Sequence, residues 1–95
     1  METKFQMEGH YRRKSYKEND KGEIKCVTAY IHVNDGFHDL TKTRFLVVFF
    51  GENAKKIMKV RNGSFLSIEG RIFKSNYRNE TYIFVGDKFN VSVRL

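Results

Sequence analysis

Hydrophobic and polar residues alternate in several short stretches of the chain, with the period of two that is typical of β-strands. The clearest case is the stretch 23–33, where one face carries Val27, Ala29, Ile31 and Val33. Further strands are predicted over 4–14, 43–50 and 64–75, and a fifth over 81–85 that bends at Gly86 and resumes over 88–94. Polar segments predict a hairpin loop over 15–22, a longer loop over 34–42 and a turn over 76–80.

The third predicted strand, 43–50, is mostly apolar on both of its faces. One face carries Arg44, Leu46, Val48 and Phe50, and the other carries Phe45, Val47 and Phe49. A sheet needs only one apolar face to fill its core. The second face must therefore be covered by a neighbour or serve as a binding surface.

One amphipathic helix is predicted between the third and fourth strands, over 52–61. Its apolar positions Ala54, Ile57 and Met58 follow helical spacing, and Asn62-Gly63 is a typical helix stop. Three strands, a helix and two strands are the layout of an all-β, five-stranded Greek-key barrel, the OB-fold. The chain has 95 residues without a linker or repeat, so we expect a single domain over 1–95.

Charge and aromatic content point to a nucleic-acid partner. The chain has 18 Lys and Arg against 11 Asp and Glu, for a formal net charge of +7. A small basic domain attracts polyanions, of which nucleic acid is the commonest. Nine Phe and five Tyr exceed what a small core needs, and the surplus can stack on bases.

Other classes of function find no support in the sequence. Cys26, the one cysteine, is expected to be a buried thiol, and a reducing cytoplasm suits the chain. No apolar stretch predicts a signal peptide or a membrane span. His10, His32 and His38 lack the spacing of metal ligands, and no nucleophile or phosphate-loop motif occurs. We therefore expect no enzyme activity, cofactor, metal or small-molecule substrate.

Two stretches, 48–54 and 62–72, resemble the bacterial single-stranded DNA-binding protein family. Members typically have phenylalanine-glycine-x-x-alanine at the helix start, which corresponds here to Phe50-Gly51-Glu52-Asn53-Ala54. They continue with a lysine-glycine-serine, which corresponds to Asn62-Gly63-Ser64, and an isoleucine-glutamate-glycine-arginine, which corresponds to Ile68-Glu69-Gly70-Arg71. A glycine in the first strand corresponds to Gly9. The resemblance extends over about the whole chain, and its specific part is 49–72.

The resemblance implies that Phe37, Phe50 and Tyr77 stack on bases. Tyr30 and Phe73 face away from the predicted core and join the stacking candidates. Arg44 stands where the family often has an aromatic residue, and its guanidinium can stack and also contact phosphate. The predicted phosphate contacts are Arg12, Arg13, Lys14, Lys17, Arg44, Arg71, Lys74 and Arg78.

These features predict sequence-tolerant binding of single-stranded DNA, in replication, recombination or repair. The family commonly forms homotetramers, some relatives are dimers, and the strand 4–14 is the edge expected to pair. Members usually carry a long tail with an acidic, apolar tip. The sequence stops at Leu95, so recruitment by that route is not expected, and a phage, plasmid or other mobile-element origin suits such a form. The alternatives are a protein-interaction subunit of a replication or primosome complex and an RNA-binding protein.

Overall fold

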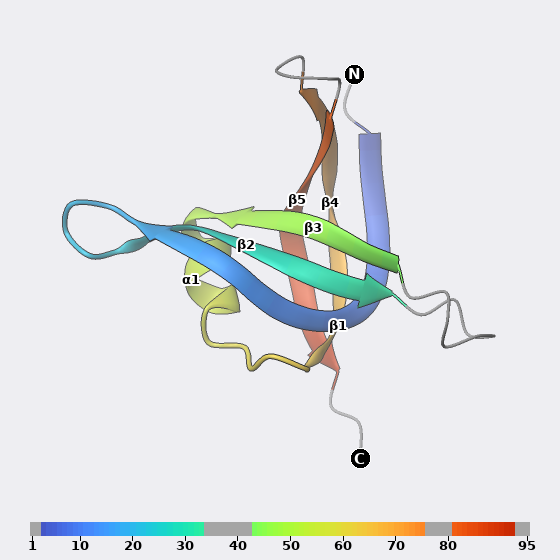
Figure 1. The fold of residues 1–95 in the computed structure, drawn as a ribbon, viewed down its shortest axis with the longest axis horizontal. Coiled ribbons are helices and arrows are strands. Elements are labelled where there is room, and N and C mark those ends of the chain that lie inside the picture. The colour runs from blue at the N-terminus through green and yellow to red at the C-terminus, as the bar shows by residue number, and fades with distance from the viewer. Residues whose placement is uncertain (1–2, 34–42, 76–80, 93–95) are drawn as a thin grey trace.

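A computed structural model describes residues 3–33, 43–75 and 81–92, and these form a closed five-stranded barrel (Figure 1). The elements in chain order are β1 (Thr3–Glu18), β2 (Ile24–Val33), β3 (Thr43–Phe50), α1 (Gly51–Ile57), β4 (Phe65–Ser75) and β5 (Thr81–Ser92). The strands are ordered β1-β2-β3-β5-β4 around the barrel, and only β3 and β5 pair in parallel. The all-β OB-fold barrel with a helix between the third and fourth strands is therefore confirmed.

β1 is long because it serves two neighbours. Its first half pairs with β4, its second half pairs with β2, and His10 lies opposite both Phe65 and His32 where the pairing changes. Gly9 precedes this point, and a Cβ atom there would lie 2.5 Å from the backbone oxygen of His32. The backbones can approach this closely only because Gly9 lacks a side chain.

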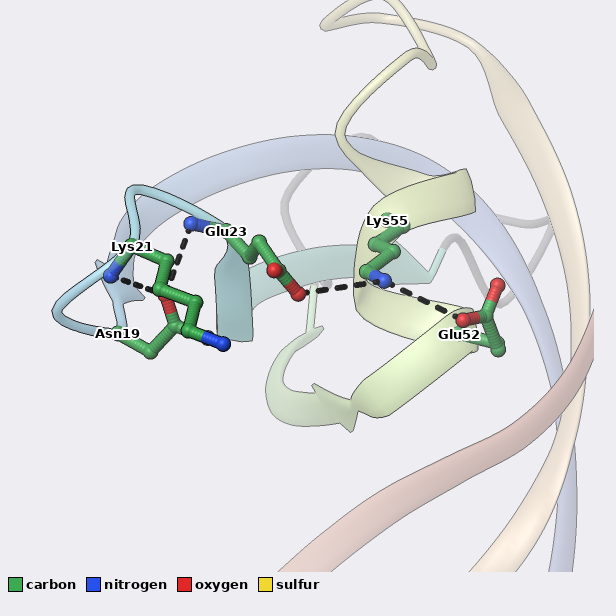
Figure 2. Close-up of polar contacts among 5 residues, drawn as sticks. All are labelled: Asn19, Lys21, Glu23, Glu52 and Lys55. Atoms are coloured by element: carbon green, nitrogen blue, oxygen red, sulfur yellow. Dashed lines mark hydrogen bonds and ion pairs between the residues drawn. The ribbon is translucent and has the colours of Figure 1, made fainter.

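The hairpin between β1 and β2 is longer than the sequence predicts, because residues 15–18 of the expected loop over 15–22 belong to β1 and only its second half forms the turn. β1 continues to Glu18 through an irregularity after Arg13, and its exposed polar residues pair with β2. The Asn19 side-chain oxygen closes the short turn by accepting from the backbone N–H of Lys21 at 2.9 Å and of Glu23 at 3.0 Å (Figure 2). Lys55 of α1 lies 3.9 Å from the Glu23 carboxylate.

The helix ends four residues before the predicted end at Arg61. Its two inward side chains, Ala54 and Ile57, are fully buried. The chain then returns to β1. There the backbone N–H of Gly63 donates to the Tyr11 carbonyl at 2.7 Å, and the backbone N–H of Tyr11 donates to the Ser64 carbonyl at 2.8 Å. Before this point, the N–H groups of residues 58–60 donate to carbonyls three or four residues earlier, so the helix ends in tight turns. No helix among the described residues is long and apolar enough to cross a membrane.

β5 is one continuous strand and not two pieces separated at Gly86. Glu69 lies opposite Lys88 and Gly70 opposite Gly86, so Asp87 is the extra residue of a bulge. Gly86 lies against the ring of Phe49, and Gly70 lies against the backbone oxygen of Val85. The bulge keeps the strand in the ladder while it bends around the barrel.

The burial of the side chains shows which face of β3 points into the core. Val47 and Phe49 are fully buried, together with inward residues of the other elements: Val27, Ala29, Ile31, Ala54, Ile57, Leu66 and Ile68. Phe84 packs edge-on against Phe45, with ring centroids 5.5 Å apart, and Phe89 packs edge-on against Phe49 at 5.9 Å. Arg44, Leu46, Val48 and Phe50 therefore lie on the outside of the barrel.

Tyr11 brings a polar atom into this core. Its side chain is 1% exposed, and its hydroxyl has no hydrogen-bond partner among the residues that the structure describes. Tyr11→Phe removes the unpaired hydroxyl and is expected to raise the free energy of unfolding by about 1 kcal/mol at neutral pH, measured by urea unfolding. The exposed Tyr16 provides the control, because Tyr16→Phe is expected to change little.

Burial also raises the pKa of Tyr11 above its ordinary value of 10.0, although the charge of Arg13 acts in the opposite direction. A raised folded-state pKa means that the folded state retains the proton after the unfolded state has lost it. Stability is therefore fully present below the unfolded pKa and falls as pH rises through the folded pKa. Tyr11→Phe is expected to lose less stability above about pH 10 than the wild type. If Tyr11→Phe instead lowers the free energy of unfolding at neutral pH, the Tyr11 hydroxyl makes a stabilising contact and is not unpaired.

Candidate nucleic-acid interface

The outward side chains of β1, β2 and β3 form cross-strand rows that mix cations with aromatic and apolar groups. Tyr30, near the centre, lies opposite Arg12 on β1 and Leu46 on β3. The neighbouring rows are His10–His32–Arg44 on one side and, beyond Ser15–Thr28–Val48, Lys17–Cys26–Phe50 on the other. The register thus gathers Arg12, Lys17, Arg44, Tyr30 and Phe50 on one face, although their sequence positions are far apart.

Two cations lie over the ring of Tyr30. The Arg44 guanidinium carbon is 4.5 Å from the ring centroid, and the Lys14 Nζ atom is 5.7 Å from it. Lys14 follows Arg12 by two residues and therefore shares its side, and the irregularity of β1 between Arg13 and Ser15 places Lys17 on that side too. A guanidinium stacked on tyrosine presents a second flat surface above the ring. A base can stack on Arg44 or displace it from Tyr30.

Phe50 ends the third strand on the surface. Its side chain is 52% exposed and does not belong to the core. Its cross-strand partner Cys26 is half-buried on the same outer face, so the expectation of a buried thiol was wrong. The reason is parity: Cys26 has the opposite orientation to Val27, which fills the core.

A second pair of exposed apolar residues lies on β4 and β5, next to the place where β5 pairs with β3. Phe73 lies opposite Ile83, and each side chain is 39% exposed. β3 and β5 pair at Val47–Phe84 and Val48–Val85, so Leu46 and Ile83 each precede the paired segment by one residue. We define the outer row as Tyr30, Leu46, Ile83 and Phe73.

Arg71 lies beside this row but is already engaged. Its Nε and Nη2 atoms donate to the two carboxylate oxygens of Asp87 at 2.8 and 2.9 Å. The guanidinium carbon also lies 5.3 Å from the centroid of the Phe73 ring. Arg71 is therefore held in a bidentate ion pair next to an exposed aromatic ring.

Two predicted phosphate contacts lie away from the outer row. Arg13 points to the helix side of β1, where it donates to the Met58 carbonyl at 3.5 Å and its backbone N–H donates to the Asn62 side chain at 2.8 Å. Lys74 lies on the reverse face of the β4–β5 hairpin, opposite Tyr82. Phe37, Tyr77 and Arg78 lie outside the described residues.

Leu46, Ile83 and Asp87 were not among the residues predicted to bind DNA. The period of two placed Leu46 on a face with Arg44 and Phe50, and this was the one available signal. Ile83 joins the surface through the parallel β3–β5 contact, and Asp87 reaches Arg71 through the β4–β5 register. Neither the register between distant strands nor a bulge can be read from alternation alone.

Comparison with known proteins supports the fold. No protein-family model and no curated protein sequence matches the chain. The structure is similar to that of Rim1, a mitochondrial single-stranded DNA binding protein from S. cerevisiae, with a TM-score of 0.74, 15% identity and 94% of each chain covered. A second crystal form of Rim1 matches with a TM-score of 0.71 and 15% identity, covering 94% of this chain and 92% of that chain.

A chain of the S. pombe Stn1-Ten1 complex also matches, with a TM-score of 0.58 and 16% identity, over 94% of this chain and 57% of that chain. These proteins are not bacterial, so the resemblance to specifically bacterial proteins goes beyond what the comparisons support. At such low identities the similarity establishes the fold alone. The chain is therefore an OB-fold, an all-β barrel of five strands with one helix between β3 and β4.

Proposed function

We propose that this protein binds single-stranded DNA with little sequence preference, through the outer row and the cations beside it. The observation that carries the proposal is the exposure of Leu46, Ile83 and Phe73 next to Tyr30, on the face where Arg12, Lys14 and Arg44 lie. A stable monomer gains nothing from exposing large apolar side chains in a cluster, so such a surface indicates a ligand. The similarity to Rim1 supports the choice of ligand.

The chemistry of the surface suits single strands of any sequence. Every base has an apolar π-face, and each base stacked on an aromatic ring contributes about 1–3 kcal/mol by alanine substitution. Duplex DNA hides these faces inside its stack, so a stacking surface discriminates against it. The cations contact phosphates, which carry no sequence information.

The test is a fluorescence-anisotropy titration of labelled oligo-dT, with a duplex of the same length as the control, at several salt concentrations. We expect much tighter binding to the single strand than to the duplex. If Arg12, Lys14, Lys17 and Arg44 each neutralise one phosphate, the log–log slope of affinity against salt is about −3. Equal or weak binding to both nucleic acids would contradict the proposal. Competition with oligo-U separates DNA from RNA binding.

A second function is favoured by the match to the Stn1-Ten1 complex. An OB-fold that serves as a subunit of such a complex would bury the outer row against a protein partner and not against bases. This alternative predicts weak binding to oligo-dT that is no tighter than binding to the duplex of the same length. The homo-oligomer predicted from the family resemblance stays a prediction, which light scattering of the purified protein measures.

A further inference from the structure

We propose that Asp87, an acidic residue beside a DNA-binding surface, strengthens DNA binding by positioning the Phe73 ring through Arg71. The inference rests on the single-stranded DNA binding proposed above. It assigns Asp87 and Arg71 as positioning residues and Phe73 as the group that touches the base. It also changes the predicted role of Arg71 from a phosphate contact to a support for the ring.

The ion pair fixes the plane of the Arg71 guanidinium. Asp87 accepts from Nε at 2.8 Å and from Nη2 at 2.9 Å, and two parallel hydrogen bonds restrict the rotation of the planar group. The guanidinium carbon lies 5.3 Å from the Phe73 ring centroid, within the range of a cation–π contact. A fixed cation next to the ring restricts the orientations that Phe73 can adopt.

The backbone holds Asp87 in place for this contact. Asp87 is the extra residue of the β5 bulge, and it continues the outward alternation of Ile83 and Val85, which lie opposite Phe73 and Arg71. Its carbonyl accepts from the Asn53 side chain of α1 at 2.7 Å. Its neighbour Gly86 is packed against the buried Phe49 ring. The backbone at Asp87 is therefore anchored to the helix and to the core, which fixes the position from which the carboxylate reaches Arg71.

Electrostatics alone predicts the opposite effect. A carboxylate next to a bound polyanion repels it, so removing the charge would tighten binding. It would also release Arg71 to contact a phosphate, which makes the salt dependence steeper by about 0.7 in the log–log slope. Positioning predicts weaker binding, because a mobile ring loses more freedom when a base stacks on it. The sign of the effect thus separates the two roles.

The experiment is a titration of labelled oligo-dT with Asp87→Asn, which is isosteric and removes the charge. We expect binding to weaken about three- to ten-fold, with an unchanged salt slope, a size typical of coupling between contacting side chains. Arg71→Lys keeps the positive charge but loses the planar fork, and we expect a loss of similar size. Tighter binding by Asp87→Asn with a steeper salt slope would overturn the inference.

The matched control is the same substitution in a Phe73→Ala background. If Asp87 acts through the ring, Asp87→Asn in that background no longer weakens binding. If Asp87→Asn merely damages the fold, it weakens binding equally in both backgrounds, and positioning is refuted.

A readout without DNA keeps this test separate from that of the proposed function. The chain has no tryptophan, so Phe73→Trp introduces a unique fluorophore at the ring position. Time-resolved anisotropy is expected to show larger nanosecond motion of this indole when Asp87→Asn is added. Unchanged motion would overturn the positioning role, whether or not the protein binds DNA. Failure of the wild type to bind oligo-dT, together with a released indole, would refute the proposed function and the effect on DNA binding, while the positioning of the ring by Asp87 would stand.

Discussion

Gly70→Ala is expected to lower the free energy of unfolding by about 3 kcal/mol, a loss of the size that severe overpacking causes. A Cβ atom at this position would overlap the backbone oxygen of Val85 and lie 2.8 Å from the ring of Phe5. A backbone oxygen cannot move aside as a flexible side chain can, because it belongs to the β4–β5 ladder next to the bulge. Urea unfolding followed by circular dichroism measures the change.

Gly22→Ala is the matched control, because it adds the same methyl group in open space. Gly22 has a φ of 79° in the β1–β2 turn, and nothing lies within 4 Å of the added atom. The left-handed conformation costs alanine about 1 kcal/mol, so this variant is expected to remain much more stable than Gly70→Ala. Equal losses in the two variants would mean that steric overlap at Gly70 is relieved elsewhere and that the close strand approach is not essential.

Phe73→Ala is expected to weaken binding to oligo-dT by about 1–3 kcal/mol, which corresponds to roughly 5- to 150-fold. The ring is exposed on the outer face, beside the apolar side chain of Ile83. Since the substitution removes no charge, the salt dependence of the affinity is expected to stay the same. A titration at two salt concentrations measures both quantities.

Tyr82→Ala controls for the loss of an exposed aromatic ring from the same hairpin. Tyr82 is 62% exposed, more than Phe73, but it lies opposite Lys74 on the reverse face. Its removal is expected to leave affinity within about two-fold of the wild type, as surface substitutions outside an interface do. If Tyr82→Ala weakens binding as much as Phe73→Ala does, DNA contacts both faces of the hairpin and the outer row is not the principal surface.

Local patterns predicted the strands well where one face is buried. The alternation of Val27, Ala29 and Ile31 placed the second strand, because buried positions must recur every two residues. The first hairpin was missed for the opposite reason. Between Ser15 and Glu18 both faces of β1 are exposed, so no hydrophobic alternation marks the strand, and cross-strand pairing alone maintains it.

Only part of the candidate site could be predicted from the sequence. Tyr30, Phe50 and Phe73 were selected by parity and resemblance, and each lies on the outside of the barrel. The roles of the cations depend on long-range contacts instead. Arg12 and Arg13 are neighbours in sequence, yet Arg12 lies beside Tyr30 and Arg13 contacts the end of the helix.

The sequence by itself determined the barrel, the position of its helix and its basic, aromatic character. These follow from short-range periodicity and composition, which any segment carries without reference to the others. Tertiary structure alone decided which apolar face of β3 is internal, which cations share a surface and what Arg71 contacts. Each of these depends on the register between strands far apart in the chain, including the β4–β5 register that brings Asp87 to Arg71. Register is a property of pairs of strands, so no single strand encodes it.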